Sequence, residues 1–411
     1  KFADIIKKIL DEWGKENYNK RYYVFNRDGD LTGYEKLVSE SGDIPSPGSI
    51  NVNIRTKTGV SYIYAVANIN NSANYHLSKP DSTLLNVYED ATINNGTTLQ
   101  LNQALTEDLK EAIATANAQF ASTEETFLEK FLSIPFIRDY GDENALRSPE
   151  PSGNIYIMSG YLNDGESVTI DNDGSVGDDN IIKLYRIVAK NTLTISTSAT
   201  ANGTFTPKYF RLCNVPKGGV LIPKNYIGTT RVDNITEYVD NNYLLQNEES
   251  QSNTTSVEPE SSYRENFGQA NNGVYTITFY YPENLQASES TINVWKDREK
   301  NSYASGSKSF TNAPTKAAYV EIQGDYIDEN NKITANASYT IHLGNFSKSL
   351  RDFNVIRNNH YVYTVQVNGV NDIIAEAKIK DDQNNDVDNP YAEGFVIKAG
   401  SGQHFEVDAH Y

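Results

Sequence analysis

The stretch HYVYTVQVNGV, residues 360–370, decides the fold class of this chain. Alternate side chains of a β-strand point to opposite faces of its sheet. One face of this stretch therefore carries only large apolar side chains, the other is mainly polar, and the Asn-Gly pair predicts a tight turn after the strand. The pattern is typical of a core strand in a β-sandwich. Its apolar face comprises Tyr361, Tyr363, Val365 and Val367.

Strand patterns of this kind continue through most of the chain. RYYVFNRDGDL at 21–31 and GVSYIYAVANI at 59–69 predict early strands, and IIKLYRIVAKNTLTIST at 181–197 is the longest β-rich run. No helical pattern follows that run, which favours antiparallel sheets over a doubly wound parallel sheet. We expect a mainly β protein with two tandem sandwich domains, residues 1–189 and 190–411.

Two stretches have helical spacing instead. Apolar residues recur at three-, four- and sevenfold steps within 99–132, which predicts a helical insertion in the first domain. FADIIKKILDEW at 2–13 predicts a short amphipathic helix. The Ser-rich, acidic segment 247–264 lacks any apolar period, so we expect a mobile excursion there.

Bulk composition excludes several classes of protein. The net charge is −18 over 411 residues, without a Lys/Arg cluster, and this charge disfavours binding to nucleic acid or to anionic lipid. No apolar run is long enough to predict a transmembrane helix. The start at Lys1, without an initiating Met or a signal peptide, suggests a processed mature form or a trimmed chain. The single cysteine, Cys213, is expected to be a buried apolar residue.

The sequence contains no recognisable catalytic motif, so we expect no enzyme and no cofactor. An enzyme of unrecognised type stays as an alternative and would require a deep polar cleft. Acidic turns at 26–30, 171–180 and 381–389 raise the question of calcium. None has the ligand spacing of an EF-type loop, and Asp and Asn favour such turns through backbone hydrogen bonds of their own.

Seven segments, taken in order, resemble one known family. They are spread over most of the chain and are similar to the type V pilins of Bacteroidales, the fimbrillins or FimA-like and Mfa-like fimbrial subunits. The segments are YYVFNRDGDL at 22–31, VSYIYAVAN at 60–68, IYIMSG at 155–160, IKLYRIVAK at 182–190, FRLCNVP at 210–216, FYYPEN at 279–284 and DFNVIRNNHYVYTVQVNGV at 352–370.

The resemblance implies a fold, a location and a way of assembling. It implies two transthyretin-like β-sandwich domains, a lipoprotein precursor exported across the outer membrane, and a structural role in surface fimbriae that supports adhesion and biofilm formation. In this family a trypsin-like protease releases the first strand of the N-terminal domain, and the terminal strand of a neighbouring subunit fills the opened groove. The implied partners are other fimbrial subunits, with host or bacterial receptors or glycans. Contact with the membrane is implied only through the removed precursor segment.

Two strands are candidates for this assembly. In YYVFN, Tyr23 and Phe25 share one face while Tyr22 and Val24 share the other, and such a strand suits the side of a groove. The family's strand ahead of this segment is missing, and the helical stretch 2–13 stands in its place.

The second candidate strand is the C-terminal HFEVDAHY at 404–411. Its polar row contains His404, Glu406, Asp408 and His410, but alternate residues lie about 6.8 Å apart, which is poor spacing for one zinc ion. The opposite row either closes the second sandwich or fills the groove of the next subunit. This candidate assembly row comprises Phe405, Val407, Ala409 and Tyr411.

Two further functions stay open within the same fold. The chain is alternatively a fimbrial tip or anchor subunit, or a surface carbohydrate-binding adhesin that does not polymerise. Trp295 in NVWKD would stack on a sugar in an adhesin, whereas a half-buried tryptophan is its ordinary structural role.

Overall fold

A computed structural model of the chain describes residues between Asn19 and Asp408, with gaps. The predicted helix at 2–13 and the acidic segment 247–264 lie outside the described residues. No helix within the described part is long and apolar enough to span a membrane. The described ranges are 19–38, 53–69, 75–77, 83–88, 92–93, 100–102, 105–138, 157–174, 176, 180–216, 218–222, 265–286, 290–304, 307–370, 372–380, 386, 395–400 and 404–408.

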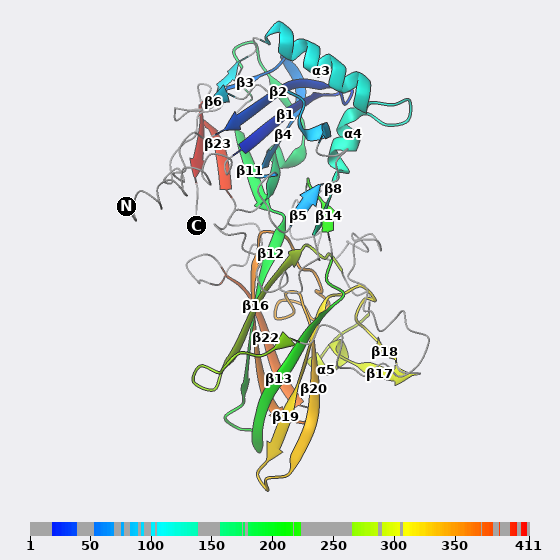
Figure 1. Cartoon of the computed structure of the whole chain (residues 1–411), viewed down its shortest axis with the longest axis vertical. Coiled ribbons are helices and arrows are strands. Elements are labelled where there is room, and N and C mark those ends of the chain that lie inside the picture. Colours follow the sequence, from blue (N-terminus) through cyan, green and yellow to red (C-terminus); the bar gives the residue numbers. More distant parts are fainter. Residues whose placement is uncertain are drawn as a thin grey trace, which may run out of the picture.

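The chain is mainly β, as predicted, and several of its sheets are antiparallel (Figure 1). The largest sheet has nine strands in the order β24-β23-β11-β9-β4-β1-β2-β6, with β10 paired to β4. Its central strand β1 pairs antiparallel with β2 on one side and with β4 on the other. The strands are β1 (Asn19–Asn26), β2 (Leu31–Val38), β4 (Gly59–Ala67), β6 (Thr92–Ile93), β9 (Met158–Leu162), β10 (Val168–Ile170), β11 (Asn180–Arg186), β23 (Phe395–Gly400) and β24 (His404–Asp408).

Helices α3 (Glu107–Phe120) and α4 (Phe127–Leu132) pack on one face of this sheet. The 99–132 helical prediction is confirmed, except that β7 (Gln100–Asn102) pairs with β3 (Asn53–Arg55) before the helices begin. Helix α3 begins only after Thr106 because that side chain caps the backbone N–H of Leu109. A small sheet adds to this cover, with β14 (Gly218–Val220), β8 (Pro135–Arg138) and β5 (Tyr75–Leu77).

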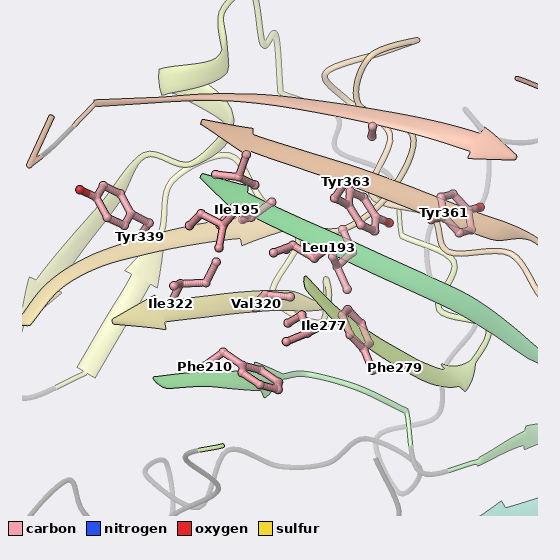
Figure 2. Close-up of a cluster of buried hydrophobic side chains, with 14 of the residues drawn as sticks. Leu193, Ile195, Phe210, Ile277, Phe279, Val320, Ile322, Tyr339, Tyr361 and Tyr363 are labelled. Atoms are coloured by element: carbon pink, nitrogen blue, oxygen red, sulfur yellow. The ribbon is translucent and has the colours of Figure 1, made fainter. Parts of the chain in front are cut away.

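Two four-stranded sheets face each other in the second part of the chain. One has the order β16-β12-β21-β22 and the other the order β15-β13-β19-β20, and apolar side chains from both fill the space between them (Figure 2). The strands are β12 (Val188–Thr197), β13 (Gly203–Cys213), β15 (Glu265–Asn266), β16 (Tyr275–Pro282), β19 (Tyr319–Asp328), β20 (Ile333–His342), β21 (His360–Gly369) and β22 (Asp372–Lys380).

Strand β21 confirms the interpretation of HYVYTVQV. Tyr361, Tyr363, Val365 and Val367 are buried in the sandwich core, whereas Thr364 and Gln366 are exposed. Three pairings of described strands depart from the antiparallel expectation: β6 runs parallel to β2, β7 to β3 and, in this sandwich, β21 to β12. The intervening chain crosses to the other sheet and back, so the two strands meet without a hairpin between them.

Several smaller elements lie outside these sheets. Strands β17 (Asn301–Ala304) and β18 (Ser307–Phe310) form a hairpin beside the sandwich. The short helix α5 (Trp295–Arg298) precedes that hairpin, and η2 (Asn163–Gly165) is a single turn after β9.

Candidate assembly interface

The C-terminal strands add to the nine-stranded sheet. Strand β23 pairs antiparallel with β11, from Asn180 opposite Ala399 to Leu184 opposite Phe395, and β24 pairs with β23. All other strands of this sheet lie within residues 19–186. The end of the chain therefore returns to a sheet that the first half of the chain builds (Figure 1).

The position of β24 bears on the expectation that the row Phe405, Val407, Ala409 and Tyr411 closes the second sandwich. Phe405 and Val407 lie in β24, opposite Ala399 and Ile397, whereas Ala409 and Tyr411 lie outside the described residues. Strand β24 joins neither four-stranded sheet, so it does not close the second sandwich. The edge of β11 offers a row of backbone donors and acceptors, and β23 satisfies them.

Tyr23 and Phe25 lie on the face of the sheet that helices α3 and α4 cover. Both side chains are fully buried, and the ring of Phe131 in α4 lies 4.7 Å from that of Tyr23 and 5.2 Å from that of Phe25. The hydroxyl of Tyr23 donates a 2.7 Å hydrogen bond to the carbonyl of Leu85. Their assignment to the side of a groove stays a prediction, and it requires part of this cover to leave.

The opposite face of β1 is equally covered. Tyr22 and Val24 are fully buried in a second apolar cluster with Ile54 of β3 and Ile63 of β4. Apolar residues on both faces of this strand thus reflect a central strand between two cores.

A buried arginine connects the two parts of the chain. Arg357 is fully buried and donates hydrogen bonds to the carbonyls of Leu221 (2.9 Å) and Val220 (2.7 Å) and to Oε1 of Glu283 (2.6 Å). Leu221 belongs to the apolar core under the helices, and its carbonyl also accepts a hydrogen bond from Ser159 in β9. A charge-assisted network therefore fixes the segment before β21 to residues 220–221, and Ser159 connects these residues to β9 of the nine-stranded sheet.

A second set of contacts fixes the passage from β11 to β12. The side-chain oxygen of Asn358 accepts 3.2 Å hydrogen bonds from the backbone and the guanidinium of Arg186. The backbone N–H of Asn358 donates to the carbonyl of Val188 at 2.9 Å. Asn358 has a φ of 65°, a left-handed conformation that asparagine tolerates better than most residues.

We call the network of Arg357, Glu283 and the carbonyls of residues 220–221 the joint. The segments quoted from the sequence contain Glu283 and Arg357 but not residues 220–221, and the sequence did not predict the ion pair. Glu283 is the one charge in FYYPEN, and Arg357 follows the apolar and amide residues FNVI in DFNVIRNN. Such a charge is the available signal, because charged side chains inside a core are paired.

Of the three acidic turns, the structure describes 26–30 in full. In the turn 26–30 the side-chain oxygen of Asn26 accepts hydrogen bonds from the backbone N–H of Asp28 and Asp30, and Gly29 has a φ of 83°. Turn chemistry therefore accounts for these residues. Among the described residues no group of three or more His, Cys, Asp or Glu side chains is arranged to hold a metal ion. Most of 381–389 lies outside them.

Two single residues have the environments expected from the sequence. Trp295 is half-buried and its ring lies 4.6 Å from that of Phe346. Cys213 is buried, as predicted.

Burial raises the pKa of the Cys213 thiol to about 11. At pH 8 we expect a thiolate fraction on the order of 0.1%, so the native chain should react with iodoacetamide far more slowly than the unfolded chain. Mass spectrometry of alkylated protein with and without denaturant measures this difference. Equal rates in both states would show that the thiol is accessible.

Comparison with known proteins gives one family match and several similar structures. Residues 279–365 match the family model described as a domain of unknown function, DUF4906. This range contains Glu283 and Arg357 of the joint. No curated protein matches the sequence.

The similar solved structures include fimbrial proteins of Bacteroidales. The tip fimbrial protein Mfa3 from Porphyromonas gingivalis, with a C-terminal truncation, is 14% identical, with 90% of this chain and 95% of that chain covered and a TM-score of 0.43. A fimbrial assembly protein from Parabacteroides distasonis is 10% identical, with 88% and 87% covered and a TM-score of 0.35. The fimbrial anchor protein Mfa2 from Porphyromonas gingivalis is 10% identical, with 89% and 88% covered and a TM-score of 0.29.

Proposed function

We propose that this chain is a structural subunit of a cell-surface fimbrium and that it joins other subunits by exchanging β-strands. The location of the C-terminal hairpin carries the proposal. Strands β23 and β24 add to the edge of β11 in a sheet otherwise built from residues 19–186. The ordered series of fimbrillin-like segments supports the same role.

Strand exchange follows from the chemistry of such an edge. The bonds between β11 and β23 are backbone hydrogen bonds, and the matching hairpin of a second subunit offers the same donors and acceptors. Exchange of an identical element between copies has a low cost in free energy, since the strand pairing that is broken within one chain forms again between two chains. We therefore place the acceptor edge at β11 and the donor in residues 395–411.

The proposal also covers the domain division, export, processing and role in adhesion of this chain. We assign residues 1–189 and 190–411, apart from the returning hairpin, to two domains of transthyretin-like plan. Export across the outer membrane, removal of an N-terminal segment by a trypsin-like protease, and a role in adhesion and biofilm formation complete the proposed function.

Protease-triggered assembly is the decisive test. Trypsin treatment of the full-length precursor is expected to convert monomers into a ladder of SDS-resistant polymers, because strand-exchanged joints dissociate slowly. A variant that ends at residue 394 should remain monomeric after the same treatment. Phe405→Asp and Val407→Asp should each weaken the ladder. Electrophoresis without boiling measures all four proteins.

A different outcome would favour the alternative function. If trimmed wild-type protein stays monomeric over a wide concentration range, the polymerising subunit is ruled out. A tip or anchor subunit, or an adhesin that does not polymerise, then accounts better for the chain.

A further inference from the structure

A hollow lies between helix α3 and the segment 83–88. Its volume is about 410 Å³, within the range of about 300 to 1,000 Å³ that small-molecule sites occupy. It lies on the helical side of the nine-stranded sheet, since both of its walls contribute to the apolar core there. Neither the C-terminal hairpin nor the joint around Arg357 lines it.

Contacts with the core fix both the segment 83–88 and helix α3, which form the two sides of the hollow. Arg21 of β1, which is fully buried, donates hydrogen bonds of 3.1 and 2.7 Å from its guanidinium to the side-chain oxygen of Asn86. Tyr23 holds the carbonyl of Leu85 in the same segment. Helix α3 is fixed through its buried apolar face. A ligand would thus meet a pre-formed site and would avoid most of the ordering cost of binding.

The lining has a definite chemical character. The carboxylates of Asp108 and Glu111 and the amides of Asn86 and Gln119 line the hollow together with small apolar side chains and Phe120. No lysine or arginine is among the described residues that line the hollow. Phosphate, sulfate and carboxylate groups would therefore be repelled. Hydroxyl donors suit the carboxylates, and the apolar C–H face of a sugar ring suits the apolar side chains.

We propose that this hollow binds a residue of an uncharged saccharide. The ligand class follows from three features together: the volume, the acceptor-rich lining in which no described lysine or arginine takes part, and the apolar and aromatic side chains beside these acceptors. The site is independent of the proposed strand exchange, because polymerisation uses none of its lining residues.

The test uses the full chain on an array of immobilised neutral, sialylated and sulfated oligosaccharides. Neutral oligosaccharides are expected to bind, and anionic ones are not. For the best neutral ligand, calorimetry should show about tenfold weaker binding for Glu111→Ala and for Gln119→Ala, since each variant removes a hydrogen-bonding group. Both side chains are exposed, so neither change should impair folding. Glu124→Ala, which removes an exposed carboxylate outside the hollow, is the matched control and should bind within twofold of wild type.

Three results would overturn the proposal. One is an array without binding above background, and another is neutral-glycan binding that Glu111→Ala and Gln119→Ala leave unchanged. The third is that the chain binds a lysine-rich peptide and no saccharide. Asp108 and Glu111 would then belong to a site for a protein partner. Laddering of Glu111→Ala after trypsin treatment is expected to match wild type, so failure here is distinguishable from failure of the proposed assembly.

Discussion

Replacing Arg357 with alanine is expected to lower the free energy of unfolding by about 3 to 5 kcal/mol, because it removes one partner of a buried ion pair. Glu283 is only 2% exposed and would lose its cation. The carbonyls of Val220 and Leu221 would lose a donor in the same place. Chemical denaturation followed by circular dichroism measures the change. In the Arg357→Ala variant we also expect the two parts of the chain to unfold in separate steps, because the network that connects them is lost.

Arg27→Ala is the matched control for this prediction. Arg27 is exposed in the turn after β1, so its removal should change the free energy of unfolding by no more than about 0.5 kcal/mol. The double variant Arg357→Leu with Glu283→Leu should recover part of the lost stability, because no unpaired charge remains. A loss below about 1 kcal/mol for Arg357→Ala would refute a structural role for the joint.

Local sequence patterns predicted local elements well. The alternation in HYVYTVQV predicted which face of β21 is buried, and the apolar spacing within 99–132 predicted the helical insertion that contains α3 and α4. Both features depend on residues a few positions apart, where side-chain periodicity is informative. The joint has no such local pattern, because the partners of Arg357 are 74 to 137 positions away in the sequence.

The candidate assembly strands illustrate the same limit. Alternation in HFEVDAHY predicted a strand, and β24 is one, but a periodicity of two residues does not say which sheet edge the strand joins. Apolar residues on both faces of β1 were interpreted as a groove side. A central strand between two cores produces the same pattern, and only the partners β2 and β4 distinguish the two cases.

Phe131→Ala is expected to cost about 3 to 5 kcal/mol of unfolding free energy, as large-to-small changes of buried aromatic residues do. The ring is fully buried at the centre of an aromatic cluster. It lies 4.7 Å from the ring of Tyr23, 5.2 Å from that of Phe25 and 5.5 Å from that of Tyr64. Leu132→Ala on the same helix removes a half-buried side chain and should cost markedly less. Equal losses for the two variants would mean that Phe131 has no special role.

Phe131→Ala also distinguishes between two places where the donor strand could bind, β1 and the edge of β11. If Tyr23 and Phe25 form the side of the groove, loss of the Phe131 ring uncovers them, and ladders should then appear without trypsin. If the edge of β11 accepts the donor strand, as we propose, Phe131→Ala should destabilise the chain while trypsin remains necessary for laddering. The second result is expected because β23 pairs with β11 and not with β1. Laddering of untreated Phe131→Ala, absent from Leu132→Ala, would move the acceptor to β1.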